Sequence, residues 1–140
     1  MQGHGHFNVQ RFDDIVVSTV DDSWNAETME AYAAAFKAVV LDAGYAEGWG
    51  LVVDARRWRL ATPEVGPMLQ ELSRWKDAQG LVASAYINDD NELKKAFATS
   101  AIGSGYLRSK MTIVDQPEQA FEWLLAAGLS IPLRLRQHFI

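Results

Sequence analysis

The chain contains no cysteine among its 140 residues, which excludes disulfides, thiolate metal sites and cysteine nucleophiles and fits a reducing compartment. Its three histidines, His4, His6 and His138, lie near the two ends, so a Ser-His-Asp hydrolase is not expected. No apolar run approaches the roughly 20 residues of a membrane-spanning helix. The N-terminal segment also lacks the apolar stretch of a signal peptide. These absences predict a cytoplasmic protein without a transmembrane segment.

Positive charge is also in short supply, since 13 lysines and arginines stand against 18 acidic residues, a net charge of -5. This balance argues against nucleic acid as a partner. The apolar fraction of 49% and the charged fraction of 22% are typical of a globular protein. No repeat, linker or low-complexity segment divides the chain. We therefore expect residues 1–140 to form a single domain, with residues 1–6 flexible.

Two short strands open the predicted fold. Residues Phe7–Phe12 alternate around Val9, and Ile15–Val20 is rich in β-branched residues. The acidic pair Asp13-Asp14 between them predicts a hairpin with a two-residue turn.

A long helix is predicted from Asn25 to Ala43, because its apolar residues recur at helical spacing. Ser23 or Asn25 can cap its start, and Gly44 suits a left-handed stop. The later elements alternate between apolar strands and amphipathic helices. They are a strand at Trp49–Asp54, a helix at Pro63–Gln79 capped by Thr62, a strand at Val82–Asn88, a helix at Asp90–Ser100 opened by an Asp89–Glu92 capping box, a strand at Lys110–Val114 and a helix from Asp115 to Ala127.

The order β-β-α-β-α-β-α-β-α predicts the α/β class. Right-handed crossovers make the later strands parallel, and the hairpin supplies an antiparallel edge strand. We therefore predict a single mixed sheet of about five strands.

This order, with the strand end VVDARRW, the strand VASAYINDD and the helix PEQAFEWLL, resembles the SpoIIAA-like proteins of the STAS superfamily (sulfate transporter and anti-sigma-factor antagonist). The resemblance covers about Phe7 to Leu125 and implies a non-enzymatic regulatory or protein-interaction domain. The SpoIIAA-like proteins also resemble the Sec14/CRAL-TRIO lipid-binding proteins in part of their fold, which implies an apolar-ligand site as an alternative.

The chain departs from this family at the start of the second helix. Anti-sigma-factor antagonists of this fold resemble one another in an Asp-Ser-Ser-Gly turn whose serine is phosphorylated. Here the turn reads Ala61-Thr62-Pro63-Glu64, so Thr62 is the only hydroxyl available as a phosphoacceptor. A threonine before proline at this position is typical of a helix cap, and we favour that interpretation.

The strongest candidate site lies between Leu51 and Glu64, where a strand end meets a helix start. Arg56, Arg57 and Arg59 around Trp58 can bind an anionic ligand, or can be a solvated loop that balances nearby acids. Asp54 is expected to anchor that loop by hydrogen bonds. The tentative ligand-binding residues are Asp54, Arg56, Arg57, Trp58, Arg59 and Thr62.

Other candidates are weaker. His4 and His6 are spaced for one face of a strand, but no further metal ligands are evident, so no metal or other cofactor is expected. Gly103 and Gly105 follow a helix and do not join a strand to one, which favours a helix stop over a phosphate loop. Trp24 and Trp58 stand at helix approaches and can form the rim of a pocket.

The C-terminal tail Leu129–Ile140 begins with eight residues, 129–136, that alternate apolar with polar side chains, which is a strand pattern. Such a strand can pack on its own sheet, exchange with a second subunit in a homodimer, or contact another partner.

Three functions therefore remain open: a regulatory or protein-interaction domain, a binder of a small apolar or anionic ligand near Asp54–Trp58, and an enzyme of unknown class. The enzyme ranks last, because no nucleophile is paired with a base in the sequence.

Overall fold

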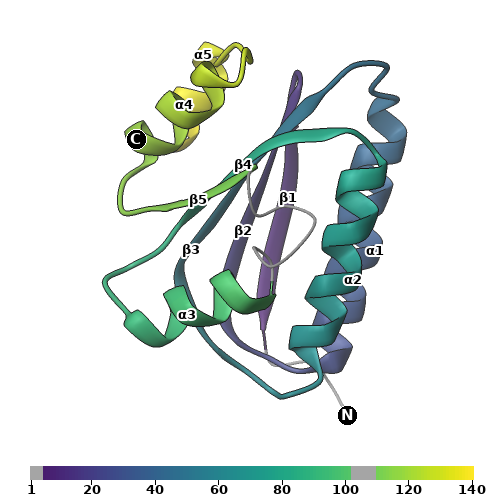
Figure 1. The fold of residues 1–140 in the computed structure, drawn as a ribbon, viewed down its shortest axis with the longest axis vertical. Helices are drawn as coiled ribbons and strands as arrows, with labels where there is room; N and C mark the ends of the chain where they lie inside the picture. Colours follow the sequence, from purple (N-terminus) through teal and green to yellow (C-terminus); the bar gives the residue numbers. More distant parts are fainter. Residues whose placement is uncertain (1–4, 102–109) are drawn as a thin grey trace.

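The structure is a computed structural model and describes residues 5–101 and 110–140. Its elements alternate between strands and helices along the chain (Figure 1). In order they are β1 (His6–Phe12), β2 (Ile15–Trp24), α1 (Ala26–Ala43), β3 (Trp49–Ala61), α2 (Val65–Ala78), β4 (Leu81–Ile87), α3 (Glu92–Ala101), β5 (Met111–Val114), α4 (Pro117–Ala126) and α5 (Leu133–His138).

The strands form one mixed sheet in the order β1-β2-β3-β4-β5. β1 pairs antiparallel with β2, and β2 to β5 run parallel to one another. The predicted α/β class, the five strands and the antiparallel edge strand are thereby confirmed. Strand β3 lies between two parallel neighbours and is apolar over its first half because both of its faces are covered.

Helices cover both faces of the sheet (Figure 1). α1 and α2 lie side by side on one face, where Phe36 and Leu72 pack against Leu51 and Val53. α4 and α5 lie on the other face, where the buried residues of this second core include Phe121 and Leu135. The sheet therefore has two separate apolar cores, one on each side.

Helix α1 has the ends that its sequence predicts. The side chain of Asn25 accepts a hydrogen bond from the backbone N–H of Thr28 at 3.0 Å, so Asn25, and not Ser23, is the cap. Gly44 adopts φ 60° and ψ 44°, the left-handed conformation that glycine permits at least cost.

Strand β3 is longer than predicted. The segment with Arg56, Arg57 and Arg59 was expected to be a loop, but it continues β3 as far as Ala61. The reason is that β2 also continues beyond Val20, to Trp24, and pairs with this segment. A polar sequence remains a strand where a neighbouring strand satisfies its backbone.

Thr62 does not cap α2, which corrects the predicted role of that residue. The cap position is Glu64, which makes no side-chain hydrogen bond, and the helix begins at Val65. The N–H of Thr62 donates to the carbonyl of Trp24 at 3.0 Å, and its own carbonyl accepts from Val65 at 3.1 Å. Thr62 is thus held at the end of β3 and opens a turn.

The cap of α3 also differs from the prediction. The side chain of Asn91 accepts from the N–H of Lys94 at 3.2 Å, whereas Asp89, the predicted cap, pairs with the Lys94 ammonium. Asn91 thus provides the contact that the sequence had suggested for an acidic residue. At α4 the Gln119 side chain accepts from the N–H of Gln116 at 3.0 Å.

The C-terminal segment forms a helix, α5, and not the predicted strand. Leu133 and Leu135 alternate in the sequence, but Leu133 is 69% exposed while Leu135 is fully buried. Residues two apart point to opposite sides of a helix, so the alternation produces one inward side chain. The ring of Phe139 packs on Phe121 at 5.8 Å, which ties the segment to its own α4.

Two predictions concern residues outside the described part of the chain. Gly103 and Gly105 lie within residues 102–109, and most of the predicted flexible segment lies within residues 1–4. His6 already belongs to β1. Over residues 5–101 and 110–140, no helix is both long and apolar enough to cross a membrane.

Candidate ligand-binding site

A cavity of about 60 Å³ lies between the sheet and the helices α1, α2 and α3. The sheet contributes residues near the carboxyl ends of the parallel strands β2, β3 and β4, which is where open α/β sheets bind ligands. Its lining is mostly apolar, with aromatic side chains from both the sheet and the helices. These aromatic residues are Trp24, Tyr32, Trp58, Tyr86 and Phe97.

A bulge in β3 turns Trp58 toward this cavity. Thr19 pairs with Asp54 and Asp21 with Arg57, so β3 contains one more residue than β2 over this interval. In a regular strand Ala55 and Trp58 would lie on opposite faces; the bulge places both in the core under α1 and α2. The Trp58 ring contacts Phe97 at a centroid separation of 5.3 Å. A local irregularity of the strand therefore forms part of the cavity wall.

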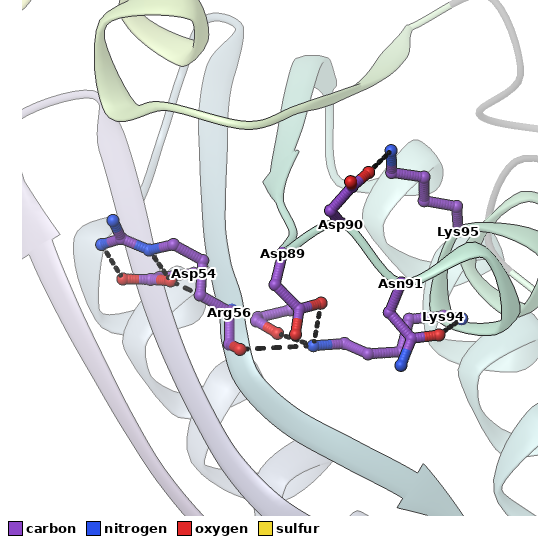
Figure 2. A network of polar contacts seen from close by, with 8 residues as sticks. Asp54, Arg56, Asp89, Asp90, Asn91, Lys94 and Lys95 are labelled. Carbon is purple, nitrogen blue, oxygen red and sulfur yellow. Dashed lines mark hydrogen bonds and ion pairs between the residues drawn. The ribbon is translucent and has the colours of Figure 1, made fainter.

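Lys94 on α3 holds this bulge in place (Figure 2). Its ammonium donates to the carbonyls of Ala55 at 2.7 Å and Arg56 at 3.4 Å, and pairs with Asp89 at 2.9 Å. Only 4% of Lys94 is exposed. A buried ammonium is tolerated when its three donors are engaged in this way.

Lys76 on α2 is a second buried lysine of the cavity wall and is 2% exposed. Its Nζ lies 5.0 Å from the ring centroid of Phe36. None of the residues that the structure describes gives it a hydrogen bond or an ion pair. Burial lowers the pKa of the Lys76 ammonium to about 7, because the apolar surroundings disfavour its charged form. At neutral pH this amine is therefore close to its titration point.

Two tyrosine hydroxyls add polar atoms to the apolar walls. Tyr32 donates to the hydroxyl of Ser18 at 2.8 Å, while burial raises its pKa to about 12. The Tyr86 hydroxyl is buried and has no hydrogen-bond partner among the described residues, and burial also raises its pKa. Because a buried hydroxyl without a partner is unfavourable, Tyr86 is a second polar group of the cavity that a ligand can satisfy.

Four of the residues predicted for the site line a neighbouring polar groove of about 660 Å³, namely Arg56, Arg57, Trp58 and Arg59. Asp54 and Arg56 bind each other, with Nε–Oδ1 and Nη2–Oδ2 distances of 3.0 and 2.8 Å. Asp54 also accepts from the N–H of Arg56, so it anchors its own segment as predicted. This pair leaves little of the Arg56 guanidinium for an anion, as Figure 2 shows.

Arg57 and Arg59 are exposed and line the groove, whereas Trp58 is half-buried and borders both the groove and the cavity. Thr62 is exposed and lines neither of the two. Its place at a turn, with a backbone fixed by Trp24 and Val65, gives no support to its use as a phosphoacceptor.

The histidine candidates do not assemble a metal site in the part of the structure that is described. His6 lies 3.8 Å from Asp22 at the exposed edge of the sheet, and His4 is outside the described residues. Within residues 5–101 and 110–140, no three side chains of the types that bind metals come together.

Three residues of the cavity were not singled out by the sequence analysis: Lys76, Lys94 and Tyr86. A signal for both lysines was nevertheless present. Lys76 follows Leu72 by four residues on the inward stripe of α2, and Lys94 precedes Phe97 by three on α3. A lysine at an inward position of an amphipathic helix is an exception that marks a buried cation.

Comparison with solved structures identifies proteins that have the same fold. A scan of protein-family models and a search of curated proteins give no match. Among solved structures, an uncharacterised DUF3478-family protein with a SpoIIAA-like fold from Shewanella loihica is similar, with a TM-score of 0.62 and 12% identity over 89% of this chain and 96% of that one. An anti-sigma factor antagonist from Mycobacterium paratuberculosis gives 0.60 and 14% identity over 90% and 96%. The phosphorylated Bacillus cell fate determinant SpoIIAA gives 0.57 and 16% identity over 85% and 99%.

The chain has the SpoIIAA-like fold, as its sequence predicted. At these identities the similarity describes the arrangement of helices and strands, and the function has to be argued from the site.

Proposed function

We propose that this protein is a non-enzymatic domain that binds a small molecule in the cavity between the sheet and the helices α1, α2 and α3. The observation that supports this most is the combination of an aromatic wall with two buried polar groups, Lys76 and Tyr86, that have no hydrogen-bond partner among the described residues. Apolar walls with a few convergent polar groups are the usual composition of a ligand site.

The location proposed here differs from the anionic site first expected around Asp54 and Arg56. Those two residues neutralise each other, and the acids Asp21, Asp22 and Asp89 of the groove offset much of its remaining positive charge. The cavity differs from the groove in both respects. Its apolar wall shields a ligand from water, and two of its polar groups have no hydrogen-bond partner among the described residues. Of the tentative ligand-binding residues, Trp58 lines the cavity, and so does Trp24, which was also predicted for a pocket rim.

A cavity-filling substitution tests this proposal. Ala98 on α3 lines the cavity, so Ala98→Leu should occupy the space, while Ala96→Leu on the exposed face of the same helix should not. We expect benzamide, a neutral aromatic probe, to bind wild type and Ala96→Leu with equal affinity in isothermal titration calorimetry, and to bind Ala98→Leu at least tenfold more weakly. Equal binding to all three proteins, or binding to none, would contradict the proposed cavity.

A second candidate is a regulatory or protein-interaction domain, as the anti-sigma factor antagonists of the same fold suggest. Two exposed leucines favour it: Leu60 and Leu93 are 63% and 74% exposed and border the polar groove near Arg57. Exposed apolar side chains beside charged ones are common in protein contacts. Native mass spectrometry of the purified protein separates the candidates, because it reports a retained small ligand, a partner or a second copy by mass.

A further inference from the structure

We propose that the cavity selects small apolar monocarboxylates and that their carboxylate pairs with the ammonium of Lys76. This inference rests on the proposed function, because it names the chemical class of the ligand that the cavity holds. It also identifies Lys76 as the residue that determines specificity.

The contrast between the two buried lysines is the first argument. Lys94 has two carbonyls and the Asp89 carboxylate around its ammonium. Lys76 is buried to a similar degree, yet among the described residues its ammonium interacts with the Phe36 ring alone. A buried cation without a counter-ion is strongly unfavourable. An anionic group on the ligand removes this penalty, whereas a neutral ligand leaves it in place.

The described residues that line the cavity include no anion that could take this role. The titratable side chains that line it with Lys76 are Tyr32 from α1, Tyr86 from β4 and Lys94 from α3. Both tyrosines have raised pKa values and are neutral near pH 7. No carboxylate occurs among the described residues that line the cavity. Because none of these described residues supplies a negative charge to complement Lys76, we expect the ligand to supply it.

The size of the cavity limits the rest of the ligand. At about 60 Å³ the cavity has room for a small molecule only. Aromatic rings such as Trp58 and Phe97 line it, and they pack well against another flat ring. A carboxylate on one aromatic ring or on a short chain fits these limits better than a long acyl chain.

Benzoate and benzamide are a matched pair for the test, since they share size and shape and differ in charge. At pH 6 we expect isothermal titration calorimetry to show benzoate binding at least tenfold more tightly than benzamide. Because the pKa of Lys76 is about 7 in the free protein, benzoate binding at pH 8 must be accompanied by proton uptake. Its affinity should then fall about tenfold from pH 6 to pH 8, while that of benzamide stays constant.

Substitution of Lys76 provides a second, independent test of its role. Lys76→Met should remove the preference for benzoate and its pH dependence while benzamide binding stays within about twofold. The control is Lys37→Met, which removes a half-buried lysine beside Trp75. It should keep both the preference for benzoate and the pH dependence. The wild-type pH series decides the matter even if Lys76→Met fails to fold. Equal, pH-independent binding of both probes would overturn this inference and leave the proposed function standing; binding of neither would overturn both.

Discussion

Lys76→Met is expected to increase the free energy of unfolding at pH 7 by on the order of 3 kcal/mol. The native lysine is 2% exposed and has no ion-pair partner among the described residues, so the folded state has to neutralise or desolvate its amine. Methionine has a similar length and fills the same space without a charge. Most core substitutions lower the free energy of unfolding. An increase in Lys76→Met would therefore point specifically to removal of this unpaired cation.

The same substitution should alter how stability depends on pH. The pKa of Lys76 is about 7 in the folded protein against an ordinary value of 10.5. Between these values the unfolded chain binds the additional proton, so stability rises with pH over this window. Below about pH 7 both states are protonated and the penalty is complete. The rise from pH 7 to pH 9 should be about 2 kcal/mol.

Urea unfolding of wild type and Lys76→Met at pH 7, 8 and 9 measures both effects. We expect the variant to be more stable at pH 7 and the difference to shrink toward pH 9. Lys37→Met is the control and should follow the wild-type slope. If wild type and Lys76→Met show parallel pH dependences, the lysine has an ordinary environment and the account of the cavity is wrong.

Unlike Lys76→Met, the substitution Lys94→Met is expected to lower the free energy of unfolding, by about 2–4 kcal/mol. Its ammonium is a hydrogen-bond donor to the carbonyls of Ala55 and Arg56 at the β3 bulge. Without it, carbonyls that are buried or half-buried lose a partner. The loss should also loosen the bulge, and with it the position of Trp58.

The neighbouring lysine is a matched control. Lys95 is 28% exposed and pairs with Asp90 and Glu92, which are themselves largely exposed. Ion pairs of this kind contribute about 0.5 kcal/mol or less, so Lys95→Met should shift the urea midpoint very little. The two lysines appear together in Figure 2. A loss in Lys94→Met no larger than that in Lys95→Met would show that the bulge does not depend on this contact.

Much of the fold follows from local patterns in the sequence. The β-branched run at Ile15–Val20 and the helical spacing before Gly44 lie where β2 and α1 form. These signals are local and agree with the tertiary structure. The extension of β3 was missed because it depends on a pairing partner, the residues of β2 beyond Val20. The helix α5 was missed because a short alternation of apolar and polar residues fits a strand as well as a helix with one buried leucine.

The site was predicted less completely than the fold. The cavity lies near the strand ends, and its lining includes Trp24 and Trp58, the two tryptophans predicted for a pocket rim. The arginines attracted attention because they are charged and close together in sequence. The structure pairs Arg56 with Asp54 and leaves Arg57 on the surface. Lys76 and Tyr86 come from different elements, and only the packed fold brings them to one cavity.

The location of the ligand site is tested most directly by the indole N–H signals of the tryptophans in an NMR titration with benzoate. Trp24 and Trp58 line the cavity, whereas Trp123 packs on the opposite face of the sheet. We expect the signals of Trp24 and Trp58 to shift in a saturable manner while that of Trp123 stays in place. Unchanged Trp24 and Trp58 signals, with shifts confined to the backbone N–H groups of Arg57 and Arg59 in the groove, would contradict the account.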